Sequence, residues 1–252
     1  MIGVAIPAHN EAQVLALCLQ SVLCAARALD SAEEVRVVVI LDSCTDGTRE
    51  VAEVFGVDVV ATGARNVGHA RAAGADYLLS LGVRWLAFTD ADTEVGPDWL
   101  KHQLALGSDA VCGTVAVRDW SCHGSAAVAL AAHFAASYTD ADGHRHIHGA
   151  NLGVCAQAYR RAGGFAPLAC HEDVALVRAL EQSGARIAWS ARPRVFTSAR
   201  RQVRARGGFG DALLAAATPL ALAWSGACVQ LAGELAGEFT GGAGAGAAGA
   251  AP

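Results

Sequence analysis

The 252-residue sequence is poor in charge and has almost no lysine. Charged residues make up 17% of the chain, compared with about 25% in an average globular protein, and Lys101 is the only lysine. The formal net charge is −5, so the sequence lacks the excess of basic residues that binds a nucleic-acid backbone. We therefore expect no nucleic-acid partner.

Disulfide and zinc-binding patterns are also missing. The eight cysteines include no C-x-x-C pair and follow no regular spacing, which argues against a disulfide framework or a zinc ribbon. The chain begins without the charged segment, apolar run and cleavage site of a secretory signal. These features fit buried thiols in a reducing compartment, so we expect a cytoplasmic protein.

Short apolar segments alternate with helical patterns over the first 90 residues. Residues 35–41 (VRVVVIL) are nearly all β-branched and aliphatic, as in a strand buried on both faces. The alternation predicts an α/β fold with a mostly parallel central sheet flanked by helices, in which ligands bind at the carboxyl ends of the strands. We expect strands at 3–6, 35–41, 57–61 and 85–89, and helices at 11–29, 45–55 and 66–81.

The pattern is less regular after residue 95. Residues 212–233 carry no charge, but Pro219 interrupts them, so we expect a packed or surface-lying helical hairpin there rather than a membrane span. The further elements expected are helices at 97–106, 125–137, 156–162 and 174–182, and strands at 110–117, 146–154 and 186–190. The predicted organisation is one domain at 1–200, with halves 1–95 and 96–200, a helical extension at 201–240 and a disordered Ala/Gly tail at 241–252.

Polar residues follow the predicted strands of the first half. Asp42 stands where a buried strand emerges, and a carboxylate there can accept an N–H from the edge of a base, whereas Asp46 is most simply a helix cap or turn residue. The segments concerned are Pro7-Ala8-His9-Asn10-Glu11, Asp42-Ser43-Cys44-Thr45-Asp46-Gly47-Thr48, Asn66-Val67-Gly68-His69-Ala70-Arg71 and Asp90-Ala91-Asp92.

Two of these segments point to anion and cation binding. Asn66 and Gly68 lie where a helix begins, and helix N-termini favour anions, although an ordinary capped helix explains them equally well. Arg71 lies one turn further, on a side that faces either the nucleotide or Asp42. Asp90 and Asp92 end an apolar run and are costly to ionise there without a partner. Mg²⁺ or Mn²⁺, which binds through few carboxylates plus substrate phosphates, is such a partner.

Together these segments resemble the glycosyltransferase family 2 pattern on the GT-A fold. The similarity spans residues 2 to about 199 and includes two later segments. These are Gly149-Ala150-Asn151 with Tyr159-Arg160-Arg161-Ala162-Gly163-Gly164-Phe165, and His171-Glu172-Asp173-Val174-Ala175-Leu176 with Arg178-Ala179-Leu180 and Gly184.

The resemblance implies that a nucleotide-diphosphate sugar binds across the strand ends, with a UDP-sugar as the first candidate. It implies that Asp92, with Asp90 beside it, binds the Mn²⁺ or Mg²⁺ that bridges the two phosphates. The donor-binding residues carried over are Pro7, Ala8, Asn10, Glu11, Asp42, Asn66, Gly68, Arg71, Asp90, Ala91 and Asp92.

The resemblance also implies an inverting reaction on a hydroxyl acceptor, which is a small molecule, a glycan or a lipid-linked group. Asp173 is then the general base, and Glu172 binds the acceptor or orients the base. The alternative is a structural role for this pair, as an acidic helix N-terminus that complements the helix dipole. His171 lies directly before the pair, where it would contact the acceptor.

Two features depart from the pattern or stay open. Many relatives carry a late histidine that ligates the metal, whereas this chain has Val195-Phe196-Thr197-Ser198-Ala199-Arg200-Arg201 there. Arg200 or Arg201 reaching the diphosphate is one hypothesis, and a solvated basic run is the other. His144, His146 and His148 alternate with Arg145 and Ile147, so a strand there would place all three on one face, as a metal site or as a polar face.

Two other functions compete with a glycosyltransferase. A nucleotidyltransferase would want a glycine-rich, basic loop after the first strand, but residues 7–13 contain neither Lys nor Arg. A non-catalytic sugar-nucleotide binder or membrane-associated scaffold would predict loss of Asp92 or Asp173, and both are present. Further expectations are peripheral membrane contact through residues 209–236, and compatibility with a homodimer.

Overall fold

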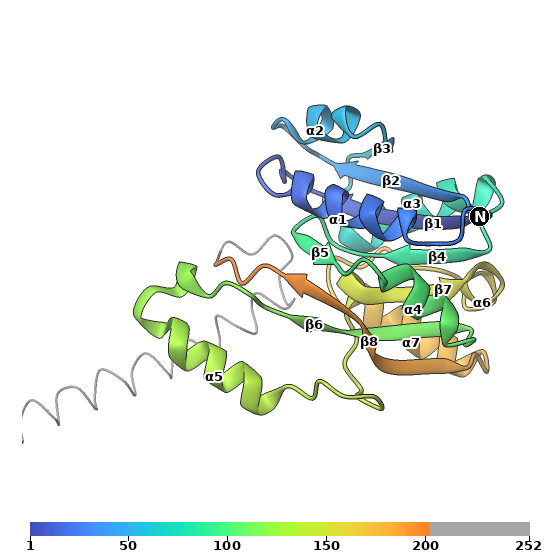
Figure 1. Ribbon diagram of the computed structural model, residues 1–252. Helices are drawn as coiled ribbons and strands as arrows, with labels where there is room; N and C mark the ends of the chain where they lie inside the picture. The colour runs from blue at the N-terminus through green and yellow to red at the C-terminus, as the bar shows by residue number, and fades with distance from the viewer. Residues whose placement is uncertain (202–252) are drawn as a thin grey trace, which may run out of the picture.

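The predicted apolar strands lie side by side in one sheet (Figure 1). The computed structural model describes residues 1–201. Its strands are β1 (Ile2–Ala8), β2 (Val35–Asp42), β3 (Asp58–Thr62), β4 (Trp85–Phe88), β5 (Thr93–Val95), β6 (Ala110–Ala116), β7 (Leu152–Cys155) and β8 (Ile187–Thr197). Their order across the sheet is β3-β2-β1-β4-β7-β6-β8-β5.

The first half of the sheet is parallel and the second half is mixed. Strand β1 pairs in parallel with β2 and β4, and β2 with β3, as the β-α-β-α-β-α-β order predicts. Strand β7 runs antiparallel to β4 and β6, β8 runs parallel to β6, and β5 runs antiparallel to β8. Four of the seven strand pairs are therefore parallel, which confirms the predicted mostly parallel α/β fold.

Helices cover both faces of this sheet (Figure 1). Helices α1 and α4 pack on one face, and α3, α6 and α7 pack on the other. The helices are α1 (Leu15–Arg27), α2 (Thr48–Val54), α3 (Val67–Ser80), α4 (Trp99–Ala105), α5 (Ala127–Ser137), α6 (Ala156–Arg161) and α7 (Glu172–Gln182), with 3₁₀ turns η1 (Ser121–Ala126) and η2 (Gly149–Asn151).

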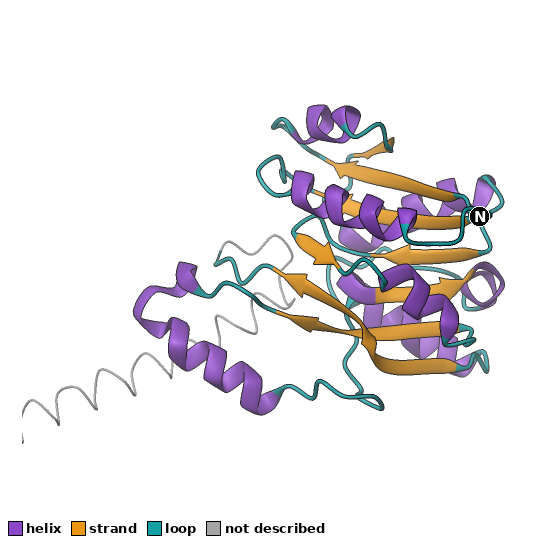
Figure 2. Cartoon of the chain, in the orientation of Figure 1, coloured by secondary structure: helices purple, strands orange, loops and turns teal. Residues whose placement is uncertain are grey.

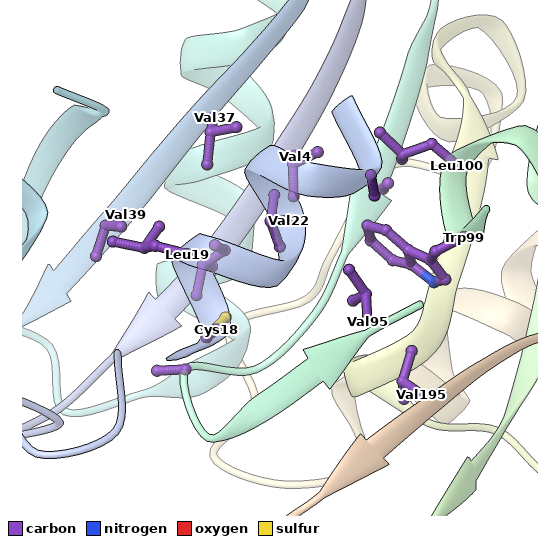
Figure 3. Close-up of a cluster of buried hydrophobic side chains, with 14 of the residues drawn as sticks. Val4, Cys18, Leu19, Val22, Val37, Val39, Val95, Trp99, Leu100 and Val195 are labelled. Atoms are coloured by element: carbon purple, nitrogen blue, oxygen red, sulfur yellow. The ribbon is translucent and has the colours of Figure 1, made fainter. Parts of the chain in front are cut away.

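The continuous apolar character of β2 follows from this two-sided burial. Val37 and Val39 point into the cluster with α1, whereas Val38 and Ile40 point into the cluster with α3. Figure 3 shows the first cluster, in which Trp99 of α4 lies among valines of the sheet. Alternate residues of one strand therefore bury into two separate cores, and none can be polar without cost.

Two expectations for the mixed half of the sheet were wrong, and one of its strands was not expected. The strand expected at 146–154 begins only at Leu152. Strand β8 continues past the predicted end at Ser190 to Thr197, opposite a register shift between Gly113 and Val115. The three-residue strand β5 was not expected, and it is held by pairing with β8 rather than by a pattern of its own.

Residues 202–252 hold the predicted contact segment at 209–236, most of the predicted helical extension at 201–240 and the tail at 241–252. All lie outside the described residues and stay predictions. Within residues 1–201, none of the helices combines the length and the apolar character that crossing a bilayer requires.

Asn151 ties together four elements of the mixed half. Its buried side chain accepts a hydrogen bond from Trp99 Nε1 at 2.9 Å and donates to the carbonyl oxygens of Thr114, at 2.8 Å, and Pro193. The amide thereby satisfies groups of α4, β6 and β8 at the start of β7. Asn151 is thus a structural residue within the Gly149-Ala150-Asn151 segment.

We expect the substitution Asn151→Leu to lower the free energy of unfolding by about 3 kcal/mol, because it leaves several buried polar groups without partners. Urea denaturation of the variant and the wild type measures the change. The matched control is Gln157→Ala, at an exposed position of α6, which should leave stability almost unchanged. Equal stability of the two variants would contradict the role given to Asn151.

Candidate active site

The loops at the carboxyl ends of the parallel strands hold an unusual backbone conformation. Four non-glycine residues of the described chain have positive φ, between 47° and 58°: Asn10, Ser43, Arg65 and His171. The first three follow β1, β2 and β3, and the fourth directly precedes α7. Such conformations cost free energy and cluster at functional sites, so the backbone independently marks the region that the sequence pattern indicates.

The loops after β1 and β2 lie beside each other at the arrowhead end of the sheet (Figure 2) and are joined by side chains. Asn10 Oδ1 accepts a hydrogen bond from the Thr45 amide at 2.7 Å, and Thr48 Oγ1 accepts one from the Glu11 amide at 2.9 Å. Asp46 accepts from the amides of Ala12 and Thr48, both at 3.1 Å, which is the turn role that the sequence favours for it.

Asp42 holds the β3–α3 loop against the end of β2. Its two carboxylate oxygens accept hydrogen bonds from the amides of Arg65, at 2.9 Å, and Asn66, at 2.6 Å. Burial alone would raise the pKa of Asp42, but these backbone N–H groups, together with the hydroxyls of Thr62 and Ser43, hold the pKa below its usual value. Asp42 is therefore an ionised group at the strand end, with its orientation fixed.

The first turn of α3 is occupied by protein groups rather than open to an anion. Asn66 caps the helix by accepting from the His69 amide at 2.9 Å, and the Gly68 amide donates to the Leu168 carbonyl at 3.0 Å. A Cβ on Gly68 would overlap the backbone of Ala166 and Leu168. Gly68 thus permits the segment before α7 to lie against α3, and of the two alternatives the geometry supports the capped helix.

Arg71 connects the acidic pair after β4 with the acidic start of α7. Its guanidinium is buried, contacts Asp90 Oδ1 at 2.5 Å and forms a second ion pair with Glu172. Arg71 therefore pairs with Asp90 and Glu172 and not with Asp42, which was one of the two directions that the sequence had left open. The guanidinium of Arg71 lies against Gly149, and a Cβ at that position would overlap it.

Asp173 lies beside this pair, in the first turn of α7. Its Oδ2 accepts a hydrogen bond from the Gly149 amide at 2.7 Å, and its Oδ1 accepts from the Val174 amide at 2.8 Å. The carboxylate is thus directed by η2 and by its own helix. Glu172, by contrast, is almost wholly buried against Arg71.

The three histidines before η2 lie in a loop and not on a strand. Their rings still share one side, with centroids 5.5 Å apart for His144 and His146 and 6.0 Å apart for His146 and His148, and Tyr138 stacks on His146 at 4.0 Å. Stacked rings present their faces and not their nitrogens to one another, so the loop forms an aromatic layer. The single-face prediction holds in a different backbone conformation from the one expected.

His148 was not recognised in the sequence as a neighbour of Asp173. Burial lowers the pKa of His148 to about 4, although the charge of Asp173 acts in the opposite direction. The imidazole is thus neutral near pH 7, and its Nε2 lies 3.0 Å from the hydroxyl oxygen of Tyr138. The H-x-H spacing marked this segment, but no sequence signal placed it beside Asp173.

Arg200 joins Glu11 and Asp92 from the segment after β8. Its Nη1 and Nη2 lie 2.5 and 2.7 Å from the two carboxylate oxygens of Glu11, and Nη2 also lies 3.2 Å from Asp92 Oδ2. Burial raises the pKa of Asp92 to about 6 in spite of the positive charge of Arg200. The positive charge of Arg200 therefore does not offset the cost of burying the ionised carboxylate.

The charge balance of these groups fits a divalent cation. Glu11, Asp92, Asp90 and Glu172 supply four carboxylates, and Arg200 and Arg71 supply two guanidiniums, which leaves a net charge of −2. Within residues 1–201 no cluster of three or more His, Cys, Asp or Glu can hold a metal ion. The net charge of −2 is what one divalent cation would balance, and Mn²⁺ and Mg²⁺ can bind through one or two carboxylates together with ligand phosphates.

The site residues predicted from the sequence thus fall into two connected groups. One joins Asn10, Glu11, Asp92 and Arg200 at the ends of β1 and β4. The other runs along α3, from Asp42 through the Asn66 cap to Arg71, and on to Asp90 and the Glu172–Asp173 pair. Pro7 and Ala8 end β1, and Ala91, which separates the two aspartates in the sequence, is buried.

We expect Arg71→Leu to lower the free energy of unfolding by about 3–5 kcal/mol, because it leaves Glu172 buried without a counter-charge. The double variant Arg71→Leu/Glu172→Leu should recover much of this loss, since no unpaired buried charge remains at Glu172. Urea denaturation of the wild type, both single variants and the double variant tests this. Strict additivity of the two single effects would show that the pair is not coupled.

Comparison with known proteins agrees with this geometry. The sequence model of the family described as Glycosyl transferase family 2 matches residues 3–161. No curated protein matches the chain.

Solved structures share the fold at low sequence identity. S. aureus TarS 1–349 in complex with UDP-GlcNAc is 15% identical with a TM-score of 0.60, over 82% of this chain and 61% of that one. Glucosyl-3-phosphoglycerate synthase from Mycobacterium tuberculosis in complex with Mn²⁺, UDP and glucosyl-3-phosphoglycerate is 19% identical with a TM-score of 0.54, over 81% and 72%.

A third structure covers more of the chain. The mannosyltransferase PcManGT from Pyrobaculum calidifontis in complex with GDP-Man and Mn²⁺ is 19% identical with a TM-score of 0.55, over 96% of this chain and 76% of that one. The chain thus spans about three fifths of the TarS fragment and a larger share of the other two proteins.

Proposed function

The chain belongs to glycosyltransferase family 2, and we propose that it transfers a sugar from a nucleotide-diphosphate donor, most simply a UDP-sugar, to a hydroxyl acceptor with inversion at the anomeric carbon. The observation that carries the proposal is the joining of donor-side and acceptor-side carboxylates through Arg71 at the carboxyl end of β4. Neighbouring structures hold UDP-GlcNAc, UDP with Mn²⁺, and GDP-Man with Mn²⁺, which supports this donor class.

The donor nucleoside would lie against the loops after β1 and β2. Pro7, Ala8 and Asn10 would line this pocket, with Asp42 accepting an N–H from the base. Support comes from the bond between Asn10 and the Thr45 amide, which holds the two loops in one fixed arrangement. A pocket set before the ligand arrives loses less conformational entropy on binding.

Other residues taken from the family resemblance would act on the nucleotide indirectly, through the residues that they hold in place. The Asn66 amide donates to Asp42 and so orients it, whereas the Gly68 amide donates to the Leu168 carbonyl and holds the segment before α7 against α3. The buried Arg71 would act on the donor through Asp90. Glu11 would line the pocket while its carboxylate holds Arg200.

A divalent metal would be held by Asp92, with Asp90 close to it. Bound there with the diphosphate, Mn²⁺ or Mg²⁺ supplies positive charge to the departing nucleoside diphosphate. Burial raises the pKa of Asp92 to about 6, so its ionised form is costly there, and a metal would supply positive charge that stabilises the buried carboxylate. Arg71 keeps the neighbouring Asp90 in place.

Asp173 would act as the general base. As the acceptor oxygen attacks the anomeric carbon, its proton passes to Asp173 and the bond to the diphosphate oxygen breaks on the opposite face of the sugar. The Gly149 amide supports this role because it fixes the direction of the carboxylate. Glu172 would then orient the base through Arg71, since its own burial keeps it away from an acceptor.

We expect Asp173→Asn to reduce sugar transfer by at least about a hundredfold, because an amide cannot take the acceptor proton. Binding of UDP with Mn²⁺, measured by calorimetry, should change less than about twofold. Glu181→Gln is the matched control, as it changes an exposed carboxylate of the same helix and should leave transfer intact. Full activity of Asp173→Asn would show that Asp173 is not the base.

We expect Asp92→Asn to remove the dependence of UDP binding on Mn²⁺, because the proposed metal ligand loses its charge. Calorimetric titration with UDP, with Mn²⁺ and with EDTA, measures the affinity in both states. Asp98→Asn, at an exposed position before α4, is the control that should retain the dependence. An unchanged Mn²⁺ effect in Asp92→Asn would place the metal elsewhere.

A further inference from the structure

The guanidinium of Arg200 contacts Asp92, the carboxylate that the proposed function assigns as a metal ligand. Arg200 forms two close contacts with Glu11 and a third with Asp92 Oδ2. Both carboxylates are largely shielded from solvent, with side-chain exposures of 6% for Glu11 and 12% for Asp92. Burial acts to lower the pKa of Arg200, but the hydrogen bonds to Glu11 and the charge of Asp92 raise it overall, so the guanidinium is a charged group.

We propose that Arg200 is the cation paired with Asp92 in the free protein, so that a divalent metal binds well only together with the donor diphosphate. This inference rests on the proposed function. The guanidinium occupies one side of the carboxylate, and diphosphate oxygens offer it an alternative partner when the metal arrives. Arg200 is then a binding residue for the diphosphate and a competitor of the metal at the same time.

Electrostatics favours this order of binding. A divalent cation on Asp92 would lie next to a guanidinium whose Nη2 is 3.2 Å from the same carboxylate, and like charges repel strongly where solvent is largely excluded. A diphosphate brings negative charge that attracts both cations and relieves the repulsion. Metal and nucleotide should therefore bind with positive cooperativity, since each improves the site for the other.

The chemistry of arginine distinguishes this arrangement from ordinary ligation. A guanidinium stays protonated and has no lone pair for a metal, so Arg200 cannot replace the late histidine that the family resemblance led us to look for. It can release Asp92 only by moving. The backbone before it is fixed, because the Ala199 carbonyl accepts from His123 Nε2 at 2.7 Å, so rotation of the side chain is sufficient.

The test compares Mn²⁺ binding with and without UDP in the wild type, Arg200→Gln, Arg200→Lys and Arg201→Gln. Free Mn²⁺ is followed by electron paramagnetic resonance, and binding heats by calorimetry. Arg201 is exposed and has the same charge, so Arg201→Gln controls for a general loss of positive charge. Circular dichroism of each variant verifies that it is folded.

We expect Arg200→Gln to bind Mn²⁺ alone about tenfold more tightly than the wild type. Mn²⁺ should bind UDP-loaded Arg200→Gln with less cooperativity, because the competing cation is gone before UDP arrives. Arg200→Lys keeps a charge but loses the two-point hold on Glu11, so its affinity for Mn²⁺ alone should fall between the two. Arg201→Gln should match the wild type.

Two failures are distinguishable. If wild-type protein binds Mn²⁺ and UDP together, but Arg200→Gln and Arg200→Lys bind Mn²⁺ alone no more tightly than Arg201→Gln, the competition is disproved and the proposed function stands. If wild-type protein fails to bind UDP with Mn²⁺, the proposed function fails and this inference fails with it. Should Arg200→Gln prove unfolded, the comparison of Arg200→Lys with Arg201→Gln decides.

Discussion

The ion pairs of Arg71 hold the two halves of the site in one arrangement. Asp90 follows a strand of the parallel half of the sheet, and Glu172 begins α7, which lies in the chain between strands β7 and β8 of the mixed half. A single buried guanidinium binds both, and its low exposure makes each contact depend on the other. The space for Arg71 is provided by Gly149, which also directs Asp173 through its amide.

The parallel half of the fold could be predicted because its strands are buried on both faces. Val37 to Ile40 alternate between two cores, which leaves an uninterrupted apolar run in the sequence. The mixed half could not be read in this way. Strand β5 is three residues long and depends on β8, and β8 passes through Pro193 into the part that follows a register shift. Tertiary pairing, not local propensity, sets these elements.

The site was predicted in outline but not in its connections. The positions of Asp42, Asp90 and Asp92 follow from strand ends, because the carboxyl ends of parallel strands share one edge. That Arg71 would contact Glu172, about a hundred residues later, depends on how α7 packs and has no local signal. The same holds for His148 beside Asp173 and for Arg200 on Glu11. The sequence drew attention to Arg200 only because it lies where many relatives carry a metal-ligating histidine.

The closed first turn of α3 has a consequence for how a diphosphate would be recognised. The Gly68 amide donates to the Leu168 carbonyl and the His69 amide donates to the Asn66 side chain. These two amides of the first turn are therefore not available to phosphate oxygens. Long, partly hydrated side chains and mobile ions would carry that task instead. Recognition built in this manner is screened by dissolved salt, so donor affinity should vary with ionic strength more than in enzymes whose phosphate loops donate backbone amides.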